Sequence, residues 1–137
     1  MSTVVSFVYA STLCISLILG PVQERRLPAS REDVSATVKE AVRLLDSREY
    51  KTVLVDFFPP EFVKKQSTSP AATEKWLEVF SSKSVAFILP KLRSSMSVTP
   101  TFDKAGTKAV FRFKTHEGTA SLIMVKVGLY WYIEPYQ

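Results

Sequence analysis

The last third of the chain, residues 107–136, constrains the fold most strongly because it predicts a short antiparallel meander. Between Lys108 and Lys114 the side chains alternate, with Ala109, Phe111 and Phe113 on one side and polar or smaller residues on the other. Alternation with a period of two, together with aromatic enrichment, is typical of a half-buried strand. The meander therefore begins with a strand that presents an aromatic face to a core.

Two further strands and an edge strand follow from the same stretch. The polar turn at residues 116–118 contains a glycine and leads into residues 119–127, whose nearly continuous apolar character predicts a central strand covered on both faces. Residues 130–134 form the third predicted strand, which ends at Pro135 because proline donates no backbone hydrogen bond. Residues 96–102 predict a fourth strand, and Pro100 places it at a sheet edge.

The region before the meander predicts helices. Ser30 is expected to cap a first helix whose apolar stripe runs from Val34 to Leu45, and a second short helix is expected from Tyr50 to Phe58. A third helix should begin at Pro70 after a Ser69 cap. The polar run 81–84 is expected to interrupt it before another helical segment, residues 85–94, in which Pro90 is expected to produce a kink or a late start.

This order predicts an α+β fold, in which N-terminal helices pack on one face of a C-terminal, three- to four-stranded antiparallel curved sheet. The 137 residues provide room for one domain. We assign residues 31–137 to this domain and residues 24–30 to a linker.

Residues 1–23 differ from the rest of the chain in having no charged side chain and a short apolar core. This pattern is typical of a signal peptide that is cleaved on export to the periplasm or the medium. An uncleaved membrane anchor and a structural N-terminal segment are the alternatives, and contact with a membrane is expected only for the anchor. Cys14 lies in this segment and is the only cysteine, so the predicted domain offers no disulfide, cysteine nucleophile or thiolate metal site.

Most catalytic chemistries lack the residues that they need. His116 is the only histidine and lies in a predicted hairpin, so we expect no metal site and no histidine base. The four glycines form no phosphate-binding loop, and no cofactor is expected. The net charge of +5 is spread along the chain, which argues against nucleic-acid binding.

Two carboxylates are the candidate catalytic residues. Asp56 precedes two phenylalanines, and apolar neighbours raise the pKa of a carboxyl group. Glu134 follows the last predicted strand and is the second candidate for a general base. An ordinary solvent-facing carboxylate is the alternative interpretation of each.

The aromatic side chains provide a second candidate site. They predict either an apolar ligand pocket with a few polar groups or the core of a small domain. The proposed ligand-binding residues are Tyr50, Phe57, Phe62, Trp76, Phe111, Phe113 and Trp131.

The helical run through residues 45–60 and the final Gly128–Glu134 segment, in which a tryptophan follows a tight turn, resemble the nuclear-transport-factor-2-like superfamily, including the SnoaL-like proteins. More narrowly, the chain resembles small exported bacterial proteins of this domain shape. The resemblance implies a cystatin-like cone, a pocket between the sheet and its helices, and a homodimer formed through the sheet. The sequence shows no strand between the early helices, where this superfamily often has one.

The predicted function is therefore an exported, non-enzymatic module that binds a small apolar ligand or a protein partner through its aromatic pocket or sheet face. The alternative is an isomerase or dehydratase that uses Asp56 or Glu134 as its base. A third hypothesis is an anion- or nucleic-acid-binding surface made of Arg112, Lys114 and Lys126.

Overall fold

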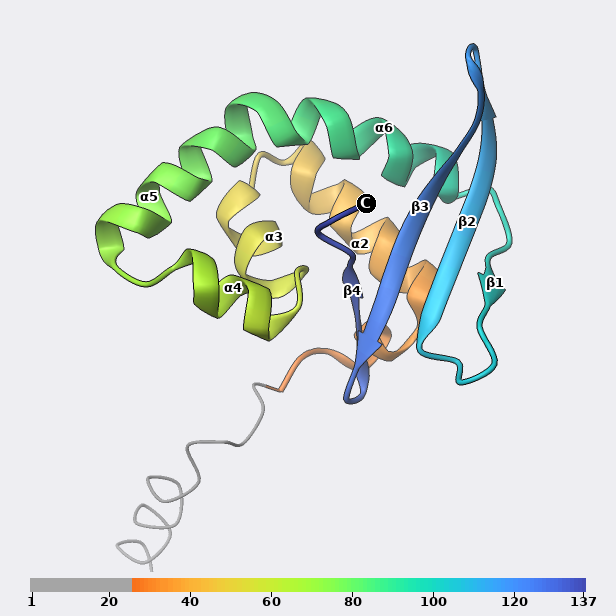
Figure 1. The fold of residues 1–137 in the computed structure, drawn as a ribbon, viewed down its shortest axis with the longest axis horizontal. Coiled ribbons are helices and arrows are strands. Elements are labelled where there is room, and N and C mark those ends of the chain that lie inside the picture. The colour runs from red at the N-terminus through yellow and green to blue at the C-terminus, as the bar shows by residue number, and fades with distance from the viewer. Residues whose placement is uncertain (1–25) are drawn as a thin grey trace, which may run out of the picture.

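The computed structural model describes residues 26–137, and Figure 1 shows them as an α+β fold. The helices precede a four-stranded antiparallel sheet with the strand order β1-β2-β3-β4. The predicted fold class is thus confirmed. The predicted leader, residues 1–23, lies outside the described residues.

The helical elements are a 3-10 turn η1 (Ala29–Glu32), α2 (Val34–Asp46), α3 (Tyr50–Asp56), α4 (Pro60–Gln66), α5 (Pro70–Val79), a π-helical turn η2 (Phe80–Ser84) and α6 (Val85–Ser95). The strands are β1 (Thr101–Phe102), β2 (Lys108–Thr115), β3 (Gly118–Val127) and β4 (Tyr130–Ile133).

Asp33, and not Ser30, caps the first long helix. Its backbone is extended, and its carboxylate accepts a 2.7 Å hydrogen bond from the N–H of Ala36. Ser30 lies within η1, so the predicted start of the helix was wrong. An extended backbone with an acceptor side chain is the geometry that an N-cap requires, and Asp33 is the residue that has it.

The predicted interruption at residues 81–84 is also wrong, because α5, η2 and α6 form one continuous rod (Figure 1). The hydroxyls of Ser81 and Ser82 donate to the carbonyl of Glu78, so these serines bond within the helix instead of ending it. The N–H of Val85 donates to the carbonyl of Phe80, five residues earlier, which defines the π turn. The rod continues through Pro90.

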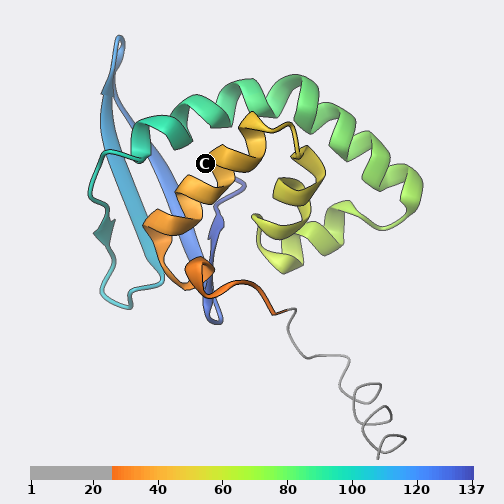
Figure 2. The same ribbon diagram turned by 180° about the vertical axis from the view of Figure 1, so that it is seen from behind.

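The aromatic face of β2 packs into the core as predicted. Ala109, Phe111 and Phe113 are buried, and Ala109 and Phe111 pair with Met124 and Leu122 of β3, which face the same way. Figures 1 and 2 show α2 and α6 beside this face, with α3, α4 and α5 farther from the sheet. The core therefore lies between the sheet and these two helices.

The outer face of β3 is not covered in the way that its apolar sequence suggests. Ile123 and Val125 are only half-buried, so the expectation of a strand covered on both faces is wrong for this face. The side-chain amide of Gln137 both accepts from the N–H and donates to the carbonyl of Ile123, at 2.8 and 3.0 Å. Beyond the end of β4, this amide continues the hydrogen bonding of β3.

The first edge strand is shorter than predicted. Only Thr101 and Phe102 pair with β2, while residues 96–100 leave the end of α6 without joining the sheet. The turn to β2 is closed by Asp103, whose carboxylate accepts from the N–H groups of Thr107 and Lys108 at 2.8 and 3.1 Å. Gly106 supplies the positive φ of 71° in this turn.

Arg31 and Phe57 cover the other edge of the sheet. The N–H of Ile133 donates to the carbonyl of Phe57 at 2.7 Å, and the guanidinium of Arg31 donates to the carbonyl of Trp131 at 2.6 Å. An unpaired strand edge invites pairing with another chain, so these contacts protect β4. Leu27, within the predicted linker, also contacts β4, through the hydroxyl of Tyr130.

Candidate ligand pocket

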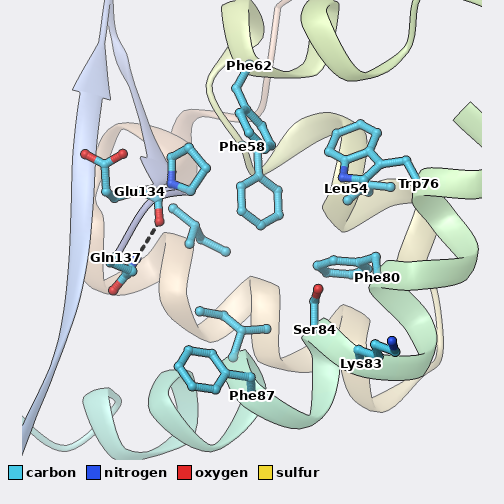
Figure 3. Close-up of a pocket in the computed structure, with 13 residues that line it drawn as sticks. Leu54, Phe58, Phe62, Trp76, Phe80, Lys83, Ser84, Phe87, Glu134 and Gln137 are labelled. Carbon is cyan, nitrogen blue, oxygen red and sulfur yellow. Dashed lines mark hydrogen bonds between the residues drawn. The ribbon is translucent and has the colours of Figure 1, made fainter. Parts of the chain in front are cut away.

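A cavity of about 330 Å³ lies between the helices and the segment that follows β4 (Figure 3). Its walls come from α3, α4, α5, η2, α6 and the chain beyond Tyr132. The lining residues are Leu54, Phe58, Phe62, Trp76, Phe80, Lys83, Ser84, Phe87, Ile88, Ile133, Glu134, Pro135 and Gln137.

Four aromatic rings form a connected wall around this cavity. The ring of Phe58 lies 5.9 Å from that of Phe80 at 90° and 5.8 Å from that of Phe62. Phe62 in turn lies 5.7 Å from Trp76, at 71°. Such tilted and edge-to-face arrangements are the favoured geometry of aromatic pairs, so the wall holds its own shape.

The local sequence explains how the rings converge. Pro59 and Pro60 separate α3 from α4 and allow Phe58 and Phe62 to meet across a sharp turn. The cap at Ser69, whose hydroxyl accepts from the N–H of Ala72 at 3.1 Å, starts the helix that carries Trp76.

The π turn aligns the rest of the wall. Trp76, Phe80, Ser84 and Ile88 recur every fourth residue and all line the cavity. In a regular α-helix of 3.6 residues per turn, this spacing would drift by about 40° per step. The wider η2 turn offsets the drift, so one side of the rod faces the cavity over several turns. π-helical turns often occur at functional sites.

Two polar groups face the cavity from this stripe. In Figure 3 the indole nitrogen of Trp76 and the hydroxyl of Ser84 point into the space beside Phe58 and Phe80. Within residues 26–137, neither group donates a hydrogen bond to another protein atom. A ligand acceptor placed beside either group would therefore find a donor.

The charged lining residues lie at the margins. Figure 3 shows the carboxylate of Glu134 directed away from Phe58 and towards β3, while its backbone carbonyl accepts from the amide of Gln137 at 2.7 Å. Lys83 is the single cation among the lining residues and extends from η2. The surface around the cavity centre is therefore mainly aromatic and uncharged.

The structure brings only some of the proposed ligand-binding residues together. Phe62 and Trp76 line the cavity, whereas Tyr50 borders a separate hollow, near Leu77. The other four are buried in the core between helices and sheet, namely Phe57, Phe111, Phe113 and Trp131. Their burial matches the alternative interpretation, in which these aromatics pack the core.

Sequence reasoning missed Phe58, Ser84 and Phe87 as lining residues. Phe58 precedes two prolines, which is a signal for a turn and not for a pocket. Phe87 is 62% exposed, and an exposed phenylalanine beside a cavity has no distinctive sequence pattern. Ser84 was expected in a helix break, and only the π turn places it on the aromatic stripe.

The two candidate bases lie in different places. Glu134 lines the cavity with its carboxylate turned away, and Asp56 ends α3 without lining the cavity. The charge of Asp56 instead acts on Arg31. His116 is exposed in the hairpin between β2 and β3, as predicted, and the described residues contain no cluster of three or more metal-binding side chains.

Arg31 is the most buried charged residue of the described part, with 2% of its surface exposed. Burial lowers the pKa of its guanidinium, and the nearby Tyr132 and Asp56 act against this shift. Its charged carbon lies 4.0 Å from the Phe57 ring centre, while its Nε has no hydrogen-bond partner. Its contacts hold η1 and α3 against β4, so we interpret it as a structural residue.

The predicted basic surface on the sheet is divided between two faces. Arg112 pairs with Ser121, on the outer face of the sheet. Lys126 lies on the same face of β3 as the buried residues Leu122 and Met124, which is the face towards the helices. The ammonium of Lys126 lies 6.0 Å from the Trp131 ring centre. Arg112, Lys114 and Lys126 therefore do not form one surface.

In residues 26–137, no helix is both long enough and apolar enough to cross a membrane.

Comparisons with protein-family models, curated proteins and solved structures found no match to this chain.

Proposed function

We propose that this protein is a non-enzymatic module that binds a small, largely apolar molecule in the pocket lined by Phe58, Trp76 and Phe80. The observation that carries the proposal is the connected aromatic wall around a cavity of about 330 Å³. Small-molecule sites are typically concave, mostly apolar and of this size, with few polar groups to orient the ligand.

The two tryptophans provide a direct test. The chain contains only Trp76 and Trp131, so its NMR spectrum has two indole N–H signals, which a Trp76→Phe variant assigns. Trp76 lines the pocket, whereas Trp131 is buried in the core. The full chain is titrated with naphthalene in the form in which it is recovered from the cells that produce it. The Trp76 signal should shift saturably, whereas the Trp131 signal should stay in place.

A filled pocket provides the matched control. Ser84→Phe places a ring in the cavity and should abolish binding, whereas Ser82→Phe adds the same ring at an exposed position of the same π turn. Naphthalene binding that persists in Ser84→Phe, or no saturable shift of Trp76 in the unmodified protein, would contradict the proposal.

The enzymatic alternative has less support from the geometry. A general base must come within hydrogen-bond reach of the substrate proton. Asp56 does not line the pocket, and the carboxylate of Glu134 points away from its centre. Turnover of a bound compound that is lost in Glu134→Gln would favour the alternative.

We further propose that the protein is exported and that residues 1–23 act as its leader, for the sequence reasons given above. A protein–partner role of the sheet face, including a homodimer, stays a prediction as well. Native mass spectrometry of the recovered protein, fraction by fraction, tests both through the mass of the mature chain and of its assemblies.

A further inference from the structure

We propose that the ligand of this pocket is a flat, uncharged aromatic compound that carries one acceptor oxygen, such as a ketone or an ester carbonyl. The inference rests on the proposed function and adds the chemical class of the ligand. It is carried by the Trp76 N–H and the Ser84 hydroxyl, two donors that lie on one stripe of the rod.

The shape of the wall favours a ring system. Phe58, Phe62, Trp76 and Phe80 contact one another in sequence through edges and tilted faces. Rings arranged in this way present both edges and faces to the space that they enclose. A planar aromatic ligand can make the same offset and edge-to-face contacts, which are favourable beyond the area that they bury.

The two donors specify an acceptor. An indole N–H donates only, and a hydroxyl can donate as well as accept. Because both groups are without a protein partner in the described part of the chain, an apolar ligand that displaced water from them would leave them unsatisfied. Trp76 and Ser84 lie eight residues apart on the rod, about 12 Å along its axis, so one carbonyl oxygen would accept from one of the two groups.

The charges at the margin disfavour an ion. A carboxylate at the Trp76 and Ser84 donors would lose water in an aromatic setting, and a buried charge is costly unless it is paired. Lys83 is the one lining cation, and Glu134 provides an opposite charge in the same lining. The site therefore has no excess of positive charge to hold an anion.

Three naphthalene derivatives of matched shape test the inference on the full chain by calorimetry. Methyl naphthyl ketone carries the acceptor, isopropenylnaphthalene replaces the oxygen by a methylene, and naphthoate replaces the ketone by a carboxylate. One hydrogen bond corresponds to about a fivefold change in affinity, so the ketone should bind at least about fivefold more tightly than the hydrocarbon. It should also bind more tightly than naphthoate.

Variants assign the preference to the two donors. Trp76→Phe keeps an aromatic ring without the N–H, and Ser84→Ala removes the hydroxyl, so the variant that lacks the donor in use should reduce the ketone-over-hydrocarbon ratio about fivefold. Ser82→Ala is the matched control, because Ser82 belongs to the same turn but donates to Glu78, and its ratio should not change.

The outcomes separate the two proposals. Equal binding of ketone and hydrocarbon, or tighter binding of naphthoate, would overturn the inference about the ligand class but leave the pocket as a binding site. A preference that survives in both Trp76→Phe and Ser84→Ala would overturn the inference as well. If none of the three compounds binds, the proposed function itself fails.

Discussion

Replacing Arg31 with alanine removes the side chain that ties the N-terminal turn η1 to the edge of the sheet. The guanidinium donates to the carbonyl of Trp131 at 2.6 Å and lies 4.0 Å from the Phe57 ring centre and 5.2 Å from that of Tyr132. The substitution therefore leaves a buried carbonyl on β4 without its donor and a hole between two aromatic rings.

The magnitude follows from four contributions. Loss of a charged hydrogen bond costs about 2 kcal/mol, and loss of the desolvated cation–π contacts costs about 2 kcal/mol. The substitution removes the Cγ and Cδ methylene groups, whose burial accounts for about 2 kcal/mol. Against these losses, folding of the variant no longer buries a charge whose Nε stays unpaired, a relief of about 3 kcal/mol. The expected net destabilisation of Arg31→Ala is about 3 kcal/mol.

Arg31→Met separates packing from charge. Methionine keeps most of the buried hydrocarbon but forms neither the hydrogen bond nor the cation–π contacts, so it should cost only about 1 kcal/mol. Arg43→Ala is the control, because Arg43 is exposed and pairs with Glu40, at 2.6 Å. An exposed pair of this kind contributes little to stability.

The assay is urea unfolding at neutral pH, followed by circular dichroism and tryptophan fluorescence. Coincident transitions in the two signals establish the two-state condition that the comparison needs. If Arg31→Ala were no less stable than Arg43→Ala, the interpretation of Arg31 as the link between η1 and β4 would be refuted. If Arg31→Met were as unstable as Arg31→Ala, the division between packing and charge would be wrong.

Three further predictions concern turns and caps. Gly118 has a φ of 130° and Gly106 a φ of 71°, and an added Cβ would meet no atom at either position. Through backbone strain alone, Gly118→Ala should therefore destabilise the fold by about 2 kcal/mol and Gly106→Ala by about 1 kcal/mol. Thermal melts measure both costs, and equal costs would contradict the argument. Desolvation acts to raise the pKa of Asp103, but hydrogen bonds from the backbone N–H groups of Lys108 and Thr107 lower it below its ordinary value. The stabilisation by this carboxylate is therefore complete above the unfolded pKa of about 4 and lost as the pH falls through the lower folded pKa. Urea titrations should find Asp103→Ala less stable than the parent protein at neutral pH but equally stable in strong acid. A difference in stability that does not depend on pH would refute the assignment. Ser69→Ala removes the cap of α5 and should cost about 1 kcal/mol, measured by urea unfolding, whereas no loss would show that Pro70 alone starts the helix.

The meander could be predicted from the sequence because each strand has a signal of its own. In β2 the aromatic residues Phe111 and Phe113 alternate with Arg112 and Lys114, and such alternation requires one face to be buried. The glycine turns at Gly118 and Gly128 have positive φ angles, as tight turns between strands require. These signals are local, so no knowledge of the rest of the fold was needed.

The helical half was harder to predict because the residues that mark helix ends also occur within helices. Serine is frequent at helix ends, yet a serine hydroxyl can also donate to a carbonyl one turn earlier, as Ser82 does to Glu78. The apolar content of β3 was similarly ambiguous, since a central strand and a half-buried outer face both accept Ile123 and Val125. Which of the two possible structures forms depends on tertiary contacts.

The pocket could be predicted only in part. Its lining comes from five helical segments, the turn at Phe58 and the chain from Ile133 onwards, so the sequence gives no spacing that unites them. The four-residue recurrence of Trp76, Phe80, Ser84 and Ile88 is visible in the sequence, but it points to one face only if the helix widens at η2. Whether an aromatic residue packs a core or lines a pocket is decided by packing, which separates Trp131 from Trp76.

The π turn has a consequence for how the length of this chain can change. A π turn is equivalent to one residue inserted into a regular helix, so deleting Ser82 would let residues 70–95 form an unbroken α-helix that is shorter by one residue. Because this deletion removes the extra residue together with the wide turn, Trp76 and Ile88 would stay within about 20° of each other. A regular helix formed without the deletion would instead turn every residue after η2 by about 100° relative to α5. In that regular helix of unchanged length, either α6 would keep Ile88 and Leu92 in the core and swing Trp76 out of the pocket, or α5 would hold its place and α6 would lose its packing. The cavity and the core therefore depend on the wide turn as long as the extra residue is present, and a regular helix of the same length would lose the pocket.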